Sequence, residues 1–286
     1  MSEKKKKSHY LSGRESRKIA RNNRKVTKKF EQEKKRKDVE AEYLTQMKDP
    51  KNIIEFDDLH TYFFTDTGTV KAVNGVTFSI PAGSTVGVVG ESGCGKSVTS
   101  LSTMRLVQGP SGQLVSGSIR FRTNAFRLDN RDKKIPVYET EIVDGEEVIV
   151  KDEKGKPVHK KNELGGYMFE MEEKVYDIAK MPIDAMRSIR GREISMIFQE
   201  PMTSLNPVFT IGNQLDEVAF LHIKGISKAN AKKRSIEMLD LVGIADAEGV
   251  YKKYPHELSG GMRQRVMIAM SLLCNPRLII ADEPTT

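Results

Sequence analysis

The sequence has few cysteines and no long apolar run, and each shortage excludes a class of protein. Two cysteines, Cys94 and Cys274, are too few for a disulfide framework, so a reducing cytoplasm is the natural setting. No apolar run reaches the roughly 18 residues that a membrane-spanning helix requires. The charged N-terminus is not followed by an apolar core, so we expect no secretory signal. The five histidines are scattered, with none at metal-ligand spacing, so we expect no structural metal.

The net charge of +8 resides in the first part of the chain. Residues 1–50 contain 17 Lys+Arg against 8 Asp+Glu, whereas the remaining residues contain 30 against 31. Ordering such a segment costs about 1–2 kcal/mol of backbone entropy per residue with little burial in return. We expect it to be mostly disordered, with helix only within about 15–47. A solvated charged tail is the favoured interpretation. Attraction to anionic lipid headgroups is the second, and RNA binding, which lacks a cluster of stacking aromatic residues, is the third.

From residue 51 onward, apolar segments alternate in a pattern that indicates strands and helices. Strands are predicted at 52–64, 76–80, 84–90, 193–198 and 277–281, and helices at 95–107, 212–222, 229–242 and 259–274. Strands that alternate with helices predict an α/β fold with a largely parallel sheet. Residues of about 123–180 have instead the pattern of hairpins, with turns at Asp144 and Gly145 and at Lys154 and Gly155. We expect them to form a solvated insertion without a catalytic role.

A glycine-rich segment fits the phosphate-binding pattern G-x-x-x-x-G-K-[ST]; it consists of Gly90, Glu91, Ser92, Gly93, Cys94, Gly95, Lys96 and Ser97. Glycines let the backbone turn its N–H groups toward phosphates, and the N-terminus of the following helix presents more of them. Lys96 is predicted to reach the β- and γ-phosphates and Ser97 to hold Mg²⁺. We include Val98, the next residue, among the nucleotide-binding residues. A chance match in a glycine-rich turn is disfavoured by the apolar segment before it and the helical pattern after it.

Two acidic residues follow the apolar run 278–281. Beside a phosphate-binding loop, Asp282 is predicted to orient Mg²⁺, directly or through water, and Glu283 to polarise the attacking water. Alone, the pattern is weak, because many strands end in acidic residues.

The segment LSGGM, residues 258–262, precedes an apolar helix. Ser259 suits a helix N-cap, and Gly260 and Gly261 leave room for a phosphate close to the backbone. An ordinary Ser-Gly-Gly cap has the same residues, so chemistry alone leaves both interpretations open.

LSGGM followed by RQR resembles the signature motif of the ATP-binding cassette (ABC) family, and four motifs occur in the family's order. The resemblance implies a P-loop NTPase (RecA-like) core with a helical subdomain, ATP and Mg²⁺ as ligands, and ATP hydrolysis. It implies that Ser259, Gly260 and Gly261 bind the γ-phosphate held by a partner subunit's P-loop. Gln199 resembles the Q-loop glutamine, which senses Mg²⁺ and water. Phe63 resembles the aromatic residue that stacks on adenine, with Tyr62 as the runner-up, and it suits a core strand position almost as well.

Three segments closely resemble the ATP-binding subunits of oligopeptide and dipeptide importers: 88–93 (VVGESG), 196–207 (MIFQEPMTSLNP) and 254–262 (YPHELSGGM). The resemblance implies a peripheral subunit at the cytoplasmic face of the membrane. Its implied partners are a second, similar ATP-binding subunit, two permease subunits and, indirectly, an extracellular substrate-binding protein. No specific nucleic acid is expected. PMTSLNP lies where the family docks a coupling helix, although a turn with two prolines and an Asx motif needs no partner.

The expected organisation is a tail, 1–50, and an ATP-binding domain, 51–286. This domain divides into a core (51–122, 181–199 and 276–286), an insertion (about 123–180) and a helical subdomain (about 200–275). The family's switch histidine and final strands lie beyond Thr286, so the core is expected to be incomplete at its C-terminus. We therefore expect the chain alone to be poorly stable and to hydrolyse ATP weakly, or to be a fragment.

The alternatives to an importer motor are a soluble ABC protein acting on ribosomes or nucleic acid, and a hydrolysis-impaired truncated cassette.

Overall fold

The computed structural model describes residues 12–143, 145–199 and 204–283. Contacts between residues divide the chain into two compact units. Unit 1 comprises Met1–Arg122 and Val175–Arg187, and unit 2 comprises Thr123–Lys174 and Ser188–Thr286. No helix within the described ranges is long and apolar enough to cross a membrane.

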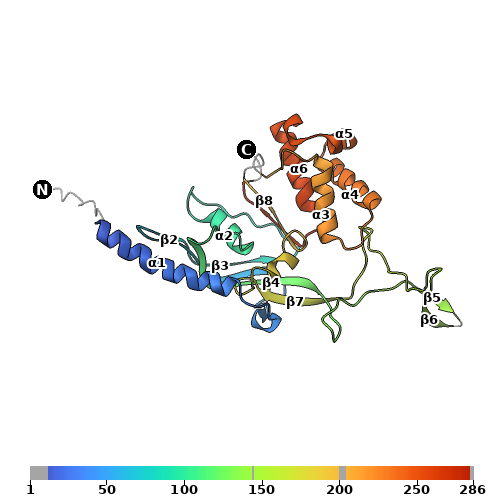
Figure 1. The fold of residues 1–286 in the computed structure, drawn as a ribbon, viewed down its shortest axis with the longest axis horizontal. Coiled ribbons are helices and arrows are strands. Elements are labelled where there is room, and N and C mark those ends of the chain that lie inside the picture. Colours follow the sequence, from blue (N-terminus) through green and yellow to red (C-terminus); the bar gives the residue numbers. More distant parts are fainter. Residues whose placement is uncertain (1–11, 144, 200–203, 284–286) are drawn as a thin grey trace. The chain divides into compact units, whose positions relative to one another are not determined.

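Unit 1 is built on a five-stranded sheet with the strand order β1-β7-β4-β2-β3 (Figure 1). The elements of the sheet and its helices are α1 (Gly13–Lys34), β1 (Leu44–Thr45), β2 (Asn52–Thr65), β3 (Gly68–Pro81), α2 (Lys96–Thr103), β4 (Gly112–Phe126) and β7 (Met171–Asp177). The last residues of β4 and the first of β7 belong to unit 2. The pairs β1–β7, β2–β3 and β2–β4 are antiparallel. The prediction of a largely parallel sheet is therefore wrong here, because the β2–β3 hairpin returns the chain directly, without a crossover helix.

The core of unit 1 comes from residues of the paired strands β2 and β4. Ile54, Leu59, Ile119 and Phe121 are fully buried, and Ile54 lies opposite Phe121 in the β2–β4 register. The predicted strands 52–64 and 76–80 are confirmed, although the second is longer because pairing with β2 begins at Gly68.

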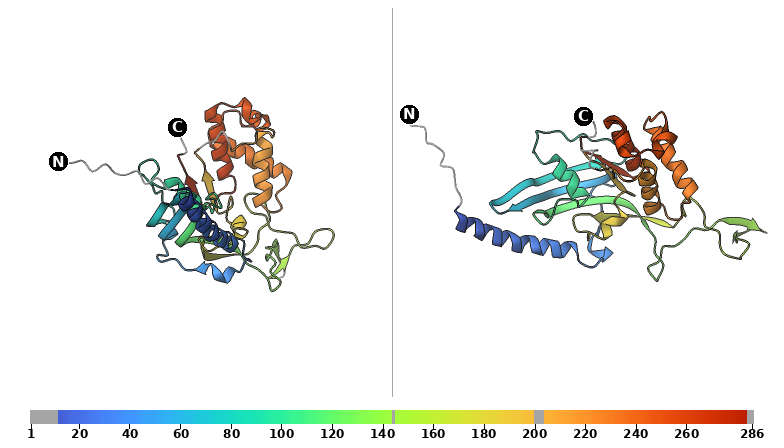
Figure 2. Two further views of the ribbon diagram at one scale, coloured as in Figure 1. Left: turned by 60° about the vertical axis from the view of Figure 1, so that its left-hand side comes forward. Right: turned by 45° about the horizontal axis from the view of Figure 1, so that its top comes forward.

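The N-terminal segment forms a helix, α1, where the sequence predicts mostly disorder. α1 starts with a capping box and lies along the β2–β3 hairpin (Figures 1 and 2). Asn23 Nδ2 donates to the Thr65 carbonyl oxygen at 2.7 Å, and Phe30 stacks on Phe64 with ring centroids 6.4 Å apart. The expected helix within 15–47 is thus confirmed for residues 15–34, and the expectation of mostly disorder is corrected for Gly13–Lys34. The few uncharged side chains of this segment fall on one helix face, and the sheet supplies the burial that the segment alone lacks.

The apolar segment before the phosphate-binding loop is not a strand. Residues 84–91 have no regular secondary structure, and Val86, Val88 and Val89 are exposed, Val89 to 92%. The predicted buried strand at 84–90 is therefore wrong. A strand needs a neighbour for its backbone N–H and C=O groups, and none of the described strands pairs with this segment.

Unit 2 combines a parallel strand pair, a hairpin and a group of helices. Its elements are β5 (Thr140–Val143), β6 (Glu146–Ile149), β8 (Ile194–Ile197), α3 (Ile211–His222), α4 (Lys228–Leu241), α5 (Ala247–Lys252), α6 (Gly260–Leu272) and β9 (Leu278–Ala281). The predicted strands 193–198 and 277–281 and the predicted helices 212–222, 229–242 and 259–274 are confirmed, with ends that differ by two residues at most.

Helices α3, α4, α5 and α6 pack around a shared apolar core in unit 2. Leu215 of α3, Leu239 of α4 and Val266 of α6 are fully buried in it. Gly212 lets α3 approach the ring of Tyr251, since a Cβ at this position would lie 2.5 Å from a ring carbon. This packing fixes the rotation of α6, the helix that follows Ser259.

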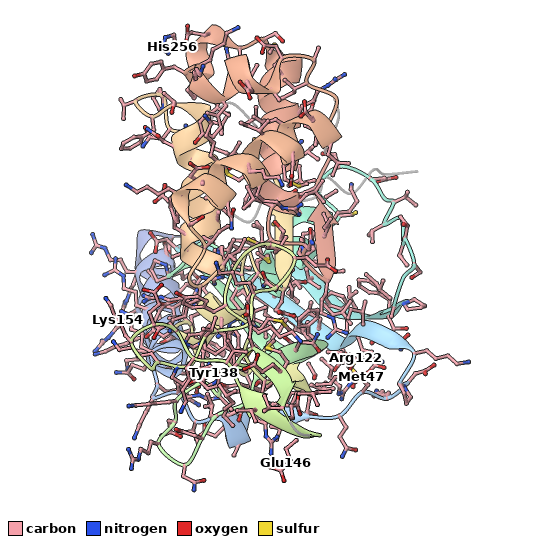
Figure 3. The ribbon with its side chains drawn as sticks, turned by 90° about the vertical axis from the view of Figure 1, so that its right-hand side faces the viewer. Met47, Arg122, Tyr138, Glu146, Lys154 and His256 are labelled. Carbon is pink, nitrogen blue, oxygen red and sulfur yellow. The ribbon has the colours of Figure 1, made fainter. Side chains whose placement is uncertain are left out.

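The predicted insertion consists largely of extended, antiparallel chain. β5 pairs with β6 across the first predicted turn, of which Gly145 is described and Asp144 lies outside the described residues. The second turn is confirmed, since the Gly155 N–H donates to the Asp152 carbonyl oxygen at 2.8 Å. Tyr138, labelled in Figure 3, lies with its ring centroid 5.0 Å from that of His159.

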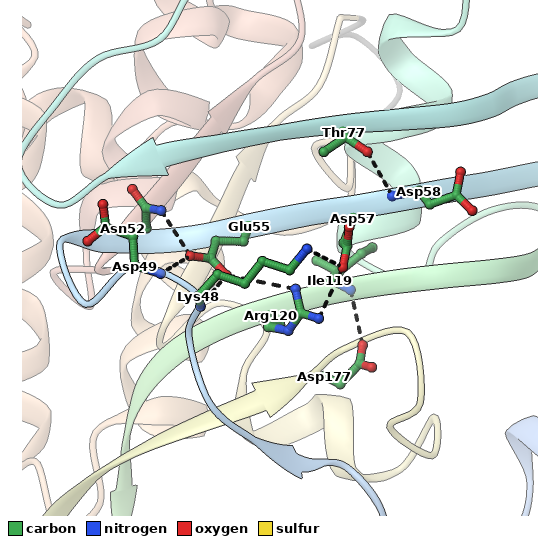
Figure 4. A network of polar contacts seen from close by, with 10 residues as sticks. All are labelled: Lys48, Asp49, Asn52, Glu55, Asp57, Asp58, Thr77, Ile119, Arg120 and Asp177. Atoms are coloured by element: carbon green, nitrogen blue, oxygen red, sulfur yellow. Dashed lines mark hydrogen bonds and ion pairs between the residues drawn. The ribbon is translucent and has the colours of Figure 1, made fainter.

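The end of the predicted insertion differs from the expectation of a solvated segment. β7 pairs with β1, and the Asp177 carboxylate accepts a hydrogen bond from the Ile119 N–H at 3.0 Å (Figure 4). Ile178, directly after the strand, is fully buried. Residues 175–178 are therefore part of the sheet and core of unit 1.

Candidate nucleotide site

The phosphate-binding loop lies in unit 1, shortly after β3 and directly before α2. Gly93 and Gly95 have positive φ angles of 79° and 98°, which residues with a Cβ rarely adopt. A Cβ on Gly95 would also lie 2.4 Å from the carbonyl oxygen of Ala72 on β3. Glycine is therefore required at position 95 for two reasons: the positive φ angle of its backbone and the close approach of β3. The helix begins at Lys96, one residue later than predicted, because the left-handed conformation of Gly95 is not helical.

Lys96 turns its side chain back over the loop that precedes it. Its Nζ donates to the carbonyl oxygens of Gly90, at 2.8 Å, and Glu91, at 3.1 Å. Neither partner neutralises the ammonium charge, so Lys96 can exchange these carbonyls for phosphate oxygens, which form stronger, charge-assisted bonds. The first turn of α2, whose leading backbone N–H groups have no acceptor within the helix, lies at the same end. The loop therefore suits the phosphate groups of a nucleotide.

A buried pair of hydroxyls anchors α2 on β2. Thr61 Oγ1 and Ser102 Oγ lie 2.8 Å apart, and both residues are buried. Ser102 donates its single proton to the Val98 carbonyl oxygen at 2.7 Å, so Thr61 is the donor of the pair. This contact fixes the helix that carries Ser97 and Val98 in its first turn. Sequence reasoning missed Thr61 and Ser102, because nothing in the local pattern shows that they meet.

Phe63 lies on β2, opposite Gly112 of β4. The ring is half-buried and reaches the Gly112 backbone, where a Cβ would lie 2.9 Å from the Phe63 Cε1 atom. The alternative, Tyr62, donates its hydroxyl to Asn74 Oδ1 at 2.7 Å. Because this hydrogen bond holds the Tyr62 ring, Phe63 stays the candidate for stacking on adenine.

The second group of predicted residues lies at the carboxyl ends of β8 and β9 in unit 2. The two strands are parallel, with Ile197 opposite Ala281, so their carboxyl ends meet at one edge. Gln199 Nε2 donates to Glu283 Oε2 at 2.5 Å, and the Asp282 N–H donates to the Ile197 carbonyl oxygen at 3.0 Å. The fold thus brings together an amide and two acidic residues from distant parts of the chain.

The donor set at this edge suits both water and a hard cation. A carboxylate offers about four lone-pair sites, so the single amide donor leaves Glu283 able to accept a proton from water. Gln199 uses its nitrogen in this contact, which leaves its oxygen as a metal ligand. Carboxylate and amide oxygens, as on Asp282 and Gln199, are among the ligands that Mg²⁺ prefers.

Ser259 caps helix α6, which confirms the predicted N-cap. Its Oγ accepts a hydrogen bond from the Met262 N–H at 3.3 Å. A Cβ on Gly260 or Gly261 would meet no atom within 4 Å, so the first turn of the helix is open. An anion can therefore approach the backbone N–H groups of Gly260 and Gly261.

The predicted site residues divide between the two units. Unit 1 carries the phosphate-binding loop and Phe63, and unit 2 carries Gln199, the LSGGM segment and both acidic residues. Residues 201–203 of PMTSLNP and residues 284–286 lie outside the described part of the chain. The expected Asx motif is confirmed, since Asn206 Oδ1 accepts from the Val208 N–H at 3.2 Å.

A polar network in unit 1 joins β2, β4 and the turn before β2 (Figure 4). The buried carboxylate at its centre is that of Glu55. Three donors reach it at 2.8–2.9 Å: Asn52 Nδ2 and the N–H groups of Lys48 and Asp49. Burial alone would raise the pKa of Glu55, but these hydrogen bonds and the nearby Arg120 guanidinium outweigh it and lower the pKa.

Comparisons with known proteins identify the family of the chain. The model of the ABC transporter family matches residues 73–181 and 164–286. The oligopeptide transport ATP-binding protein AppD of Bacillus subtilis is 43% identical over 234 residues, and the dipeptide transport ATP-binding protein DppD of the same organism is 40% identical. Both alignments cover 82% of this chain, but only 55% of AppD and 54% of DppD. The chain thus spans about half the length of the curated relatives that it matches.

A solved structure shows the same fold. The dimeric, post-hydrolysis ATP-binding cassette MJ0796, bound to ADP and Pi, has a TM-score of 0.54 at 20% identity, covering 81% of this chain and 74% of that one. This likeness confirms the predicted cassette fold. With the family match over residues 73–286, it leads to one conclusion: the chain belongs to the ABC transporter family.

Proposed function

We propose that this chain is the ATP-binding and hydrolysing subunit of an ABC importer that drives the uptake of oligopeptides or dipeptides. The observation that carries the proposal is the hydrogen bond between Gln199 and Glu283, with Asp282 beside it. A base for water, a ligand for Mg²⁺ and an amide that orients both are the groups that hydrolysis of a phosphoanhydride requires. The names of the relatives, oligopeptide and dipeptide transport proteins, support the class of substrate.

In this proposal, each group has a defined task. The backbone of 90–98 and the Lys96 ammonium hold the phosphates of ATP, and Phe63 stacks on the adenine. Ser97, Gln199 and Asp282 would hold Mg²⁺, which when bound neutralises charge on the phosphates. Glu283 takes a proton from the attacking water.

The proposed assembly contains a second ATP-binding subunit and two permease subunits at the cytoplasmic face of the membrane. The open first turn of α6, after Ser259, is a second phosphate-binding feature in one chain. In a pair of cassettes this turn would bind the γ-phosphate of the ATP held by the partner, which would lie between the partner's P-loop and this turn. ATP binding would close the pair and hydrolysis would reopen it.

The test separates nucleotide binding from peptide import. Lys96→Gln removes the ammonium but keeps the length of the side chain, so we expect ATP to bind about 10–100-fold more weakly. Lys51→Gln, at an exposed lysine of the same unit, is the matched control and should bind ATP normally. Uptake of a labelled peptide by cells with Lys96→Gln in the native gene should be lost. Unchanged uptake together with weakened ATP binding would refute the import role, and co-purification with ribosomes instead of permeases would favour a soluble ABC protein.

A further inference from the structure

Helix α1 concentrates its positive charge on one face. The exposed basic residues of this face are Arg14, Arg17, Lys18, Arg21, Arg24, Lys25, Lys28 and Lys29. At 3.6 residues per turn, these residues fall within an arc of about 140°. We call this face the basic arc. Residues 16–30 contain no acidic residue, so the arc has one sign of charge over its whole middle part.

The opposite face of α1 is held by the sheet of unit 1, which fixes the rotation of the helix. Asn23 Nδ2 donates a hydrogen bond to the carbonyl oxygen of Thr65 in the β2–β3 hairpin, and Thr27 is buried. Glu31 accepts a hydrogen bond from Gln113 Nε2 at 2.8 Å. Since these contacts follow one side of the helix from its first half to its end, the basic arc is turned toward solvent.

The charge of the arc is almost uncompensated within the described residues. Of the three acidic residues of α1, Glu15 belongs to the capping box and Glu31 is engaged with Lys34 and Gln113. Only Glu33 forms an ion pair with the arc, at 3.9 Å to Lys29. Like charges four residues apart on a helix repel each other, and ordinary protein surfaces mix both signs. An extended anionic partner would relieve this repulsion.

We propose that the basic arc of α1 binds the anionic lipid headgroups of a membrane surface. The helix has 22 residues and is therefore about 33 Å long, so it presents a row of charges that matches a plane of phosphates. The arc has no large apolar side chain to insert, so binding is electrostatic and stays at headgroup level. This proposal rests on the proposed function in one respect, which is that a subunit of an importer works next to a membrane.

A nucleic acid is the other extended polyanion, and the contacts of α1 disfavour it. Proteins that bind single strands without sequence preference usually stack bases on aromatic side chains. The aromatic residue of α1 is Phe30, and its ring is stacked on Phe64 instead. The helix thus offers charge without a stacking surface, which favours lipid headgroups.

Flotation of the full chain with vesicles tests the proposal. We expect binding to vesicles of phosphatidylglycerol and phosphatidylcholine, little binding to pure phosphatidylcholine, and loss of binding as salt is raised. The variant R17Q/R21Q/R24Q/K28Q removes four charges with a residue that keeps high helix propensity. At roughly five-fold for each of the four basic residues, it should weaken vesicle binding about 600-fold.

The matched control changes the same number of charges elsewhere. K151Q/K154Q/K156Q/K161Q replaces four exposed lysines of the insertion and should bind anionic vesicles within about two-fold of the native chain. Circular dichroism of the arc variant checks that α1 is still helical. Vesicle binding that survives in the arc variant, or that is equal for neutral vesicles, would overturn the proposal. Binding of single-stranded RNA without binding of anionic vesicles would overturn it in favour of a nucleic-acid partner.

ATP binding is measured on the same samples to keep the two proposals apart. If the arc variant loses vesicle binding but keeps the ATP affinity of the native chain, the loss is due to the basic arc alone and supports the membrane proposal. Failure of the native chain to bind ATP, with normal vesicle binding, would instead contradict the proposed function.

Discussion

The side-chain amide of Gln199 donates a hydrogen bond to the carboxylate of Glu283, although 84 positions separate the two residues. The contact follows from the register of one strand pair. Ile197 of β8 lies opposite Ala281 of β9, and each of the two functional residues comes two positions after its strand. Parallel pairing therefore delivers an amide and a carboxylate to the same edge.

Glu283→Gln should separate ATP binding from hydrolysis. The amide keeps the size of the side chain but cannot take a proton from water, so we expect the hydrolysis rate to fall by about 100- to 10,000-fold. Because the proposed function assigns the phosphates to the loop before α2, the Kd for ATP should change little. Phosphate release and fluorescent ATP binding measure the two effects. Glu153→Gln, at an exposed glutamate of the insertion, is the control, and hydrolysis at the native rate by Glu283→Gln would exclude Glu283 as the base.

Gly95→Ala should damage unit 1 through the backbone alone. A left-handed conformation costs a residue with a Cβ about 1–2 kcal/mol, and the new Cβ would lie 2.4 Å from the Ala72 carbonyl oxygen. We therefore expect a loss of about 2 kcal/mol or more in the free energy of unfolding, and weaker ATP binding as α2 is pushed from β3. Thermal unfolding and ATP titration provide the measurements.

Gly87→Ala is the matched control for this change. A Cβ at Gly87 would meet no atom within 4 Å, and its backbone is not left-handed. The variant should unfold at the same temperature as the native chain or slightly above it, since alanine restricts the unfolded state. Equal destabilisation by both substitutions would show that the close contact with Ala72 does not govern the loop.

The parts of the fold that the sequence predicts are those with a strong local pattern. Helices α3, α4 and α6 follow from apolar periodicity, and the Ser259 cap follows from residue type. A helix within 15–47 could be predicted for α1, but its packing on the sheet could not, because this packing involves Phe64 and Thr65, more than 30 residues away along the chain. The segment 84–90 shows the reverse case, in which an apolar pattern has no described neighbour with which to pair.

The candidate site shows the same division between chemistry and position. The phosphate-binding loop and the two acidic residues are recognisable from residue type and spacing. The supports of the site are not, since the Thr61–Ser102 contact and the approach of Ala72 to Gly95 arise from strand packing. The Gln199–Glu283 hydrogen bond likewise needs the register of β8 and β9, which no local pattern contains.

The two cysteines should react with an alkylating reagent at very different rates. Burial raises the pKa of Cys274 to about 11, and the thiolate is the reactive form, whereas Cys94 is exposed in the phosphate-binding loop. We expect one thiol to react in the native chain and two after denaturation, and we expect ATP with Mg²⁺ to slow the native reaction by covering the loop. Mass spectrometry after timed alkylation measures both. Cys94→Ser should leave only the slow thiol, and equal rates for the two cysteines in the native chain would contradict the burial of Cys274.

Acid should destabilise unit 1 through Glu55. Its pKa is lower in the folded chain than in the unfolded chain, so the ionised carboxylate stabilises the fold above the unfolded value of about 4.3. That contribution disappears as the pH falls through the lowered pKa of the folded chain.

Glu55→Gln leaves the N–H groups of Lys48 and Asp49 with a poorer acceptor, and at pH 7 we expect a loss of about 1–3 kcal/mol in the free energy of unfolding. The difference in the free energy of unfolding between the native chain and Glu55→Gln should then decrease as the pH is lowered below about 4.3. The control variant Glu153→Gln should show the same dependence of stability on pH as the native chain. Thermal unfolding from pH 7 to acid measures this, and a gap that stays constant would mean that the Glu55 charge does not contribute to stability.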